Sequence, residues 1–341
     1  MRRCALFQLL AVLALAGRAH AQPSVPVRST VQIYDLKSGK TRTVFQGDGF
    51  YEAPYWSADG KWMFISGGVA KKLYRIPRAG GAPQLVEVGD IDVNHDQGLS
   101  PDGKIHAISL KGELFVSGPA GKDRHQLTKP GDVFYLHAWS SDSKWILGTR
   151  RFAGFAGEAN YDICRLTPDG NQDERLTNHA ALDDGPDYGN GGRFIYFNSK
   201  RAGGFDIWRM PESGAGEGDK LAVQVTHDAA EDWFPHPSPN GKWLALLSYP
   251  PGTGTGITLT EYLAKYPEKG LSGYNLTMHP YNADVVIRLR TLPGDQMHQA
   301  KIREAKIRTV GKLLGGQGSM NLNSWLPDSS GFAFIGYEVV R

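Results

Sequence analysis

Cysteine is nearly absent from this 341-residue sequence, which contains only Cys4 and Cys164. Cys4 lies in an N-terminal segment that we expect to be removed, so the remaining chain cannot form an internal disulfide. Long hydrophobic runs are lacking as well, because no segment after residue 21 approaches eighteen consecutive apolar residues. The sequence therefore predicts neither a disulfide-stabilised scaffold nor a membrane span in the mature chain.

Excess charge is also missing once the N-terminus is set aside. The whole chain has 38 basic and 35 acidic residues, but residues 1–21 contain three arginines and no acid, which leaves 35 of each sign. A charged start, an apolar stretch over residues 5–16 and an Ala-His-Ala sequence at 19–21 are typical of a secretory signal peptide. An uncleaved membrane anchor is the alternative, which the short apolar stretch disfavours.

We therefore predict a signal peptide at 1–21, a mature chain at 22–341, and a periplasmic or secreted location. A neutral mature chain has no excess of basic residues with which to hold a nucleic acid, so we expect no nucleic-acid partner. We expect a monomer.

A short repeated phrase is the most informative feature that the sequence does have. Each copy contains an Asp-Gly, Asn-Gly or related turn, and the first five copies follow one another at intervals in the forties, a spacing typical of propellers and other repeat arrays. The copies lie at 55–62, 99–104, 139–145, 188–194, 237–243 and 325–329, the fourth being degenerate.

Each unit is predicted to contain four short strands. Asp-Gly or Asn-Gly between apolar runs is a strong hairpin signal, since these residues tolerate the positive φ of a tight turn. Strand-like runs such as 62–65 and 72–76 follow the turn, and a short outer strand such as 84–86 ends the unit. Four strands per unit are typical of one propeller blade.

The sequence thus predicts an all-β, six-bladed β-propeller in a single domain. The last copy is followed by one strand only, and residues 30–46 match the missing second half of a unit. We expect these N-terminal strands to complete the last blade and close the ring, which removes an exposed sheet edge. The predicted blades span 50–90, 94–130, 134–180, 183–230, 232–316, and 320–341 together with 30–46.

These phrases resemble the WD40-like (PD40) repeats of TolB-like propeller proteins, whose unit reads approximately W-S-P-D-G-K, an apolar strand, I-Y-x-M and L-T. The resemblance covers the chain from residue 30 onward. It extends only to the propeller domain of TolB, because too few residues precede the first repeat for the additional N-terminal domain of that protein. The resemblance implies an exported propeller, and a role as an interaction scaffold of the cell envelope is one function that it suggests.

Polar residues are concentrated where each innermost strand begins. Propellers bind ligands in or over the central channel, where every blade contributes to one concave wall. The sequence therefore predicts a site for a small polar ligand, an oligosaccharide or a peptide, with aromatic residues available for stacking. The predicted ligand-binding residues are Glu52, Asn94, His95, Asp96, Gln97, Tyr135, Asp187, Asp232, Trp233, Asn321 and Asn323.

A metal-assisted enzyme is the alternative hypothesis. Oligogalacturonate lyases are similar in placing a His- and Gln-bound metal in a propeller, which suggests His95, Gln97, His137 and His236 as ligands of Mn, Ca or Zn. The catalytic candidates are His137, His236 and Asp184, a histidine acting as general base in an oligosaccharide lyase or hydrolase. A simpler alternative is that these residues face trapped water and bond one another.

Other conspicuous residues are expected to be structural. The repeated turn acids, such as Asp59 and Asp102, are too numerous to be catalytic, and Cys164 occupies a packed strand position. One insertion, 249–284, departs from the repeat period and is predicted to contain a short helix. The sequence leaves two interpretations of this insertion: a lid over the channel, or a surface loop.

Overall fold

The computed structural model describes residues 27–153, 159–251, 283–292 and 305–340. In these ranges the regular structure is strands, apart from short 3₁₀ turns such as η1 (Pro119–Gly121), η3 (Glu217–Asp219) and η4 (Gln317–Ser319). No helix in the described ranges is long and apolar enough to cross a membrane. The predicted signal peptide and most of the 249–284 insertion lie outside the described residues.

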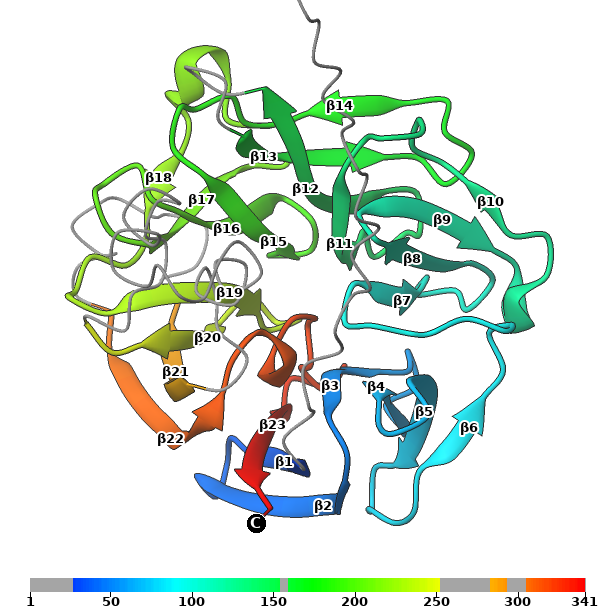
Figure 1. Cartoon of the computed structure of the whole chain (residues 1–341). Coiled ribbons are helices and arrows are strands. Elements are labelled where there is room, and N and C mark those ends of the chain that lie inside the picture. The colour runs from blue at the N-terminus through cyan, green and yellow to red at the C-terminus, as the bar shows by residue number, and fades with distance from the viewer. Residues whose placement is uncertain (1–26, 154–158, 252–282, 293–304, 341) are drawn as a thin grey trace, which may run out of the picture.

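Five antiparallel sheets surround a common centre in a β-propeller arrangement, with the first strand of each of the four four-stranded sheets nearest the centre (Figure 1). These four sheets follow one another along the chain. They comprise β3 (Tyr51–Trp56), β4 (Trp62–Gly67), β5 (Lys72–Pro77) and β6 (Gln84–Val86); β7 (Gln97–Leu99), β8 (His106–Leu110), β9 (Glu113–Ser117) and β10 (His125–Gln126); β11 (Phe134–Trp139), β12 (Ile146–Ala153), β13 (Ala159–Leu166) and β14 (Asp173–Arg175); and β15 (Asp183–Gly189), β16 (Phe194–Ser199), β17 (Asp206–Pro211) and β18 (Val223–Gln224).

The fifth sheet has seven strands and joins the two ends of the chain. Its C-terminal strand pairs with its N-terminal strand at nine positions, from Val27–Val339 to Asp35–Gly331, which confirms the predicted closure. In spatial order it contains β19 (Glu231–Pro237), β20 (Trp243–Tyr249), β21 (Ala283–Thr291), β22 (Ile307–Gly315), β23 (Gly331–Val339), β1 (Val27–Asp35) and β2 (Lys40–Asp48).

The sequence predicts six separate blades, and the described sheets differ from this prediction. One sheet is continuous where two were expected. The connection between its two parts is a single pair, Leu314 with Tyr337. On either side of it β21 pairs with β22 and β23 pairs with β1 over most of their lengths. The all-β propeller class is therefore confirmed, with four separate four-stranded sheets and one of seven strands.

The repeated phrase forms the predicted hairpin turn, and its acid is structural. In the first copy the Ser57 hydroxyl donates to Asp59 Oδ1 at 2.7 Å, and the same oxygen accepts the Lys61 backbone N–H at 3.0 Å. The side chain thus satisfies turn groups that would otherwise depend on water. The same Ser–Asp or Ser–Asn contact recurs at Ser100–Asp102, Ser140–Asp142 and Ser238–Asn240.

The repeated tryptophan joins neighbouring sheets. The indole N–H of Trp139 donates to the backbone carbonyl of Gly98 at 3.2 Å, and that of Trp56 donates to the carbonyl of Ser324 at 2.8 Å. Trp325 makes the corresponding bond to the carbonyl of His236 at 2.8 Å. In each case an indole donor from one unit satisfies a backbone carbonyl of the unit before it, which ties adjacent units together.

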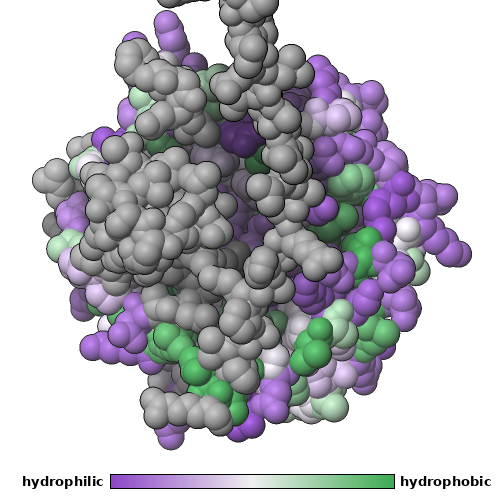
Figure 2. Space-filling view, viewed as in Figure 1, coloured by the Kyte–Doolittle hydropathy of each residue, from purple (hydrophilic) through white to green (hydrophobic). Residues whose placement is uncertain are grey.

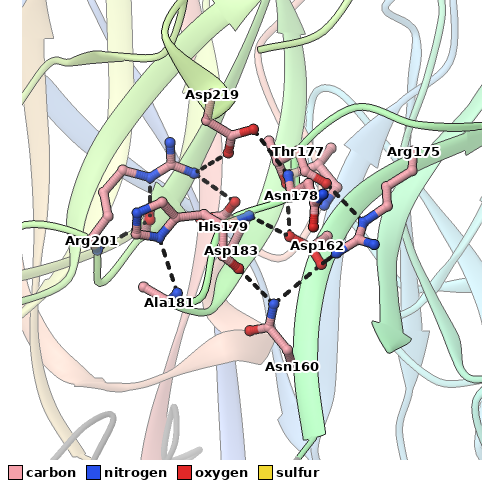
Figure 3. A network of polar contacts seen from close by, with 12 residues as sticks. Asn160, Asp162, Arg175, Thr177, Asn178, His179, Ala181, Asp183, Arg201 and Asp219 are labelled. Atoms are coloured by element: carbon pink, nitrogen blue, oxygen red, sulfur yellow. Dashed lines mark hydrogen bonds and ion pairs between the residues drawn. The ribbon is translucent and has the colours of Figure 1, made fainter. Parts of the chain in front are cut away.

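Buried carboxylates and arginines hold together the strands of single units, and Asp219 also joins two units by accepting the Asn178 backbone N–H at 3.0 Å (Figure 3). Arg175 Nη2 lies 2.6 Å from Asp162 Oδ2, while Arg201 Nη2 contacts both Asp183 at 2.7 Å and Asp219 at 3.1 Å. Asp162 and Asp183 are fully buried. Removing either arginine would leave a buried carboxylate without its cation, which is strongly destabilising.

Ring closure gives the first testable prediction. Deleting residues 27–48 removes β1 and β2 and leaves β23 with an exposed edge, so the truncated chain should be insoluble or fail to melt cooperatively. Solubility and a thermal melt of the two chains would measure this. Adding a peptide of residues 27–48 during refolding should restore part of the soluble fraction; a soluble truncation with a cooperative melt would contradict the account.

Candidate functional site

His95, which precedes β7, lies between two carboxylates near the centre of the ring. Its Nδ1 is 2.9 Å from Glu52 Oε2 on β3, and its Nε2 is 3.5 Å from Asp96 Oδ2. Burial would lower the pKa of the imidazole, but Asp96 and Glu52 outweigh it and raise the pKa to about 9. Asn321 donates to Asp96 Oδ1 at 3.3 Å and to the His95 carbonyl at 3.0 Å. The residues thus form a cation held by two anions.

His236 on β19 also has both ring nitrogens engaged. Nδ1 lies 2.9 Å from Asp187 Oδ2 on β15, and Nε2 lies 2.7 Å from the backbone carbonyl of Met320. Both contacts are hydrogen bonds only when each nitrogen carries a hydrogen, because both partners are acceptors. Asn323 supports the pair by donating to Asp187 Oδ2 at 2.8 Å and to the Pro237 carbonyl at 3.1 Å.

His137 on β11 differs from these two histidines. Its Nε2 lies 3.2 Å from Asp184 Oδ1 on β15, and that oxygen also accepts the Thr149 hydroxyl at 2.7 Å. Its Nδ1 is buried and has no hydrogen-bond partner among the described residues.

Irregular pairing in the innermost strands positions these side chains. Four of these strands skip residues in register, and the unpaired residue in β11 is His137 itself. In the other three strands a residue with positive φ precedes a proline, namely Ala53, Gly185 and Phe234. A Cβ on Gly185 would meet Asn198 Oδ1 at 2.5 Å, so this bulge requires glycine. Bulges bend a strand and change the direction of neighbouring side chains.

The other predicted ligand-binding residues of the second and third units, Gln97, Asn94 and Tyr135, are less available to a ligand. The Gln97 side chain is buried, and its Oε1 lies 3.0 Å from His106 Nε2. The Asn94 amide donates to the Ser109 carbonyl at 2.8 Å. Tyr135 is half-buried, and burial raises the pKa of its phenol to about 12. Tyr135 therefore keeps a partly exposed aromatic ring.

Asp232 and Trp233 are placed in the interior rather than on the channel wall. Asp232 is fully buried, accepts from Ser248 and contacts Arg288 at 3.1 Å, as in the carboxylate–arginine contacts of Figure 3. The Trp233 ring is fully buried and packs against Phe205, with ring centroids 4.1 Å apart. Neither side chain is exposed to a ligand in this conformation.

A cavity of about 770 Å³ runs along the channel toward the Asp-Gly turns. His137, Asp187 and Asn323 contribute to its wall, so the structure brings together these three of the predicted residues. The wall also contains seven aromatic residues that sequence reasoning missed, although most of them occupy recurrent positions in the repeat. The aromatic wall residues are Tyr55, Trp56, Trp62, Phe64, Trp139, Tyr188 and Trp325.

Comparison with known proteins now identifies the family. No family model matches the chain. An uncharacterized protein of Agrobacterium fabrum, Atu1656, is 32% identical over 333 residues, which cover 96% of this chain and 98% of that protein. A solved structure from Agrobacterium tumefaciens, provisionally named TolB, is 32% identical, covers 92% of this chain and 99% of its own, and has a TM-score of 0.72. This chain belongs to the TolB-like family.

More distant structures share the fold alone. TolB from Acinetobacter baumannii is 12% identical with a TM-score of 0.53, and the match covers 85% of this chain and 64% of that one. An oligogalacturonate lyase in complex with manganese is 14% identical with a TM-score of 0.50, covering 87% and 76% of the two chains. The TolB-like assignment therefore depends on the Agrobacterium proteins.

The suggested metal ligands do not form a coordination set in this TolB-like chain. Both ring nitrogens of His236 face protein acceptors, and the Gln97 amide oxygen faces His106. Among the described residues no three His, Cys, Asp or Glu side chains are arranged to hold a metal ion. Cys164 is buried, and burial raises the pKa of its thiol to about 12, as expected of a packed strand residue. We derive no metal-dependent step from this geometry.

Figure 2 shows hydrophilic residues in the hollow at the centre of the face turned to the viewer and over much of the described surface around it. This distribution agrees with the polar contacts of His95, His137 and His236. Polar groups at the centre and aromatic rings along the cavity wall give the channel of this TolB-like protein two chemically different parts.

The His95 contacts predict a pH-dependent contribution to stability. Because the pKa of His95 is raised from 6.5 to about 9 in the folded chain, the contribution is complete below about pH 6.5 and is lost as the pH rises through 9. His95→Gln should therefore cost on the order of 2–3 kcal/mol at pH 6 and much less at pH 10. Urea unfolding at both pH values measures this, and an equal cost at both would contradict the assignment.

Replacing Asp206, on β17, should stabilise the folded protein, in contrast to the replacement of His95. Burial and the neighbouring Asp232 raise the pKa of its carboxyl group to about 7, so the stability that it contributes is present below about pH 4 and is lost as the pH rises through 7. Asp206→Asn should therefore stabilise the protein by on the order of 2 kcal/mol at pH 8 and little at pH 4.5. A destabilised variant at pH 8 in urea unfolding would contradict this.

Proposed function

We propose that this protein is an exported TolB-like β-propeller that binds a small polar ligand, an oligosaccharide or a peptide, in its central channel. The observation that carries the proposal is the 770 Å³ cavity, whose wall combines aromatic rings with His137, Asp187 and Asn323. Ligand sites are concave and largely apolar with a few convergent polar groups, and this cavity has that composition.

Export to the periplasm or the outside of the cell is part of this proposal. It is supported by the charged start, apolar stretch and Ala-His-Ala sequence of residues 1–21. In that location the ligand could be a free molecule or a segment of an envelope protein.

The ring is proposed to contain six blades. The seven-stranded sheet divides naturally at the single Leu314–Tyr337 pair into β19–β22 and a second blade made of β23, β1 and β2. Trp325, which bridges to Phe332, adds the innermost position of this last blade. Six units then contribute to one channel wall, in agreement with the six repeated phrases.

A cavity-filling substitution tests the proposed site. Gly98 lines the cavity, and a Cβ at this position would lie 3.8 Å from the Trp139 ring, an ordinary contact. Gly98→Leu should therefore fill space needed by the ligand and weaken binding by at least tenfold, whereas Gly98→Ala should bind nearly as well as the native protein. Titration calorimetry against panels of oligosaccharides and short peptides measures the effect.

Thermal melts of both variants serve as the control for folding. Unchanged affinity in a folded Gly98→Leu protein would place the ligand elsewhere. Absence of binding by the native protein across both panels would contradict the proposed function itself.

A further inference from the structure

The carboxylates where the cavity meets the turns are paired with lysines. Asp59 Oδ2 lies 3.2 Å from Lys61 Nζ, and Asp102 Oδ2 lies 3.3 Å from Lys104 Nζ. Hydrogen bonds from the Ser57 side chain and from Lys61 lower the pKa of Asp59 to about 2, so this carboxyl is ionised and the lysine balances its charge. Among the described residues that line the cavity none is lysine or arginine. The lysines thus neutralise the wall acids without themselves lining the cavity.

The third carboxylate of the described wall, Asp187, also has a basic partner. Its Oδ2 lies 2.9 Å from His236 Nδ1 and accepts the Asn323 amide at 2.8 Å. The Nε2 atom of His137 lies 3.2 Å from Asp184 Oδ1. An ionised ligand that left water for this cavity would therefore find no unpaired charge on the described wall, and the cost of its desolvation would not be offset.

The side-chain polar atoms of the described wall that lack a hydrogen-bond partner are buried. They are Nδ1 of His137 and the hydroxyl oxygens of Tyr55 and Tyr188. Because these atoms are buried, a ligand in the cavity does not contact them in this conformation. The indole N–H groups of Trp56 and Trp139 donate to backbone carbonyls. The surface that the wall presents to a ligand is accordingly more apolar than polar.

Half-buried aromatic rings from different units supply part of this apolar surface. They are Trp56, Trp62, Phe64, Trp139 and Tyr188. The cavity opens to solvent at the turns, where three of its lining residues, Pro101, Asp102 and Pro327, are exposed. A ligand therefore meets apolar faces within the cavity and water at its open end.

We propose that the cavity takes an uncharged oligosaccharide and excludes its anionic and cationic counterparts. The C–H face of a sugar ring stacks on aromatic side chains, while the hydroxyl groups at the ring edge keep their contact with water at the open end. An extended peptide is disfavoured, because it carries an N–H and a C=O at every residue, which need partners along its whole length. This inference rests on the proposed function and specifies the ligand class of the same cavity.

Two matched pairs of trisaccharides separate the requirement for charge from the requirement for shape. Triacetylchitotriose is neutral, and chitotriose, its deacetylated form, is cationic at pH 5.5. The methyl ester of trigalacturonate is neutral, and trigalacturonate is anionic at the same pH. Titration calorimetry should show that a neutral member binds at least tenfold more tightly than its charged counterpart, because the wall has no free charge to replace the lost hydration.

Removing the lysines beside the wall acids should change this selectivity. Lys61→Gln combined with Lys104→Gln leaves Asp59 and Asp102 without their cations, so chitotriose should bind about threefold more tightly or better, with the neutral sugars unchanged. Lys144→Gln is the matched control: Lys144 lies 3.2 Å from Asp142 in the equivalent turn, and neither residue lines the cavity. This control should leave every affinity unchanged. Thermal melts check that the variants fold.

Each outcome bears on one of the two proposals. Equal or tighter binding of chitotriose or trigalacturonate by the native protein would overturn the inference. A chitotriose affinity that stays constant in the folded double variant, or rises as much in Lys144→Gln, would also overturn it. Binding of a panel peptide and of no neutral oligosaccharide, lost in Gly98→Leu, would keep the proposed function and reject the uncharged sugar. Absence of binding by every probe and by both panels would reject the proposed function.

Discussion

The structure depends on polar contacts that join each unit of the ring to its neighbour. Strand pairing holds a sheet together, but adjacent sheets of a propeller share few backbone hydrogen bonds, so side chains must connect them. Here the connections are of two main kinds: indole N–H groups donate to carbonyls of the preceding unit, and histidines contact carboxylates of a neighbouring unit near the axis. A buried polar group without a hydrogen bond destabilises the fold. Most of the polar residues near the centre therefore form hydrogen bonds or ion pairs with one another.

This requirement explains why the channel has so few groups left for a ligand. His95 and His236 both contact two acceptors, whereas His137 contacts Asp184 through one nitrogen only. Most of the polar residues that predict a site in the sequence therefore have protein partners in this structure, and the Nδ1 of His137, which has no hydrogen-bond partner among the described residues, is buried.

The repeat predicted the fold from sequence, since hairpin turns and short alternating strands are local features. It also predicted ring closure, because the half unit at the N-terminus matched the half unit missing at the C-terminus. Contacts across sheets could not be predicted, because Glu52 and His95, or Asp187 and His236, are not related by any local period. A regular strand would place residues 232 and 236 on one face, but the bulge at Phe234 breaks this alternation. The packing of the Trp233 ring against Phe205 in the interior is another contact that no local pattern shows.

Nitrogen NMR of the histidine rings tests the central claim most directly, with the His95 signals assigned by their loss in His95→Gln. Glu52 and Asp96 lie against the two ring nitrogens of His95 and raise its pKa to about 9, so the account predicts a hydrogen on both ring nitrogens at pH 7.5. A His95 ring with a single hydrogen at that pH would contradict the account.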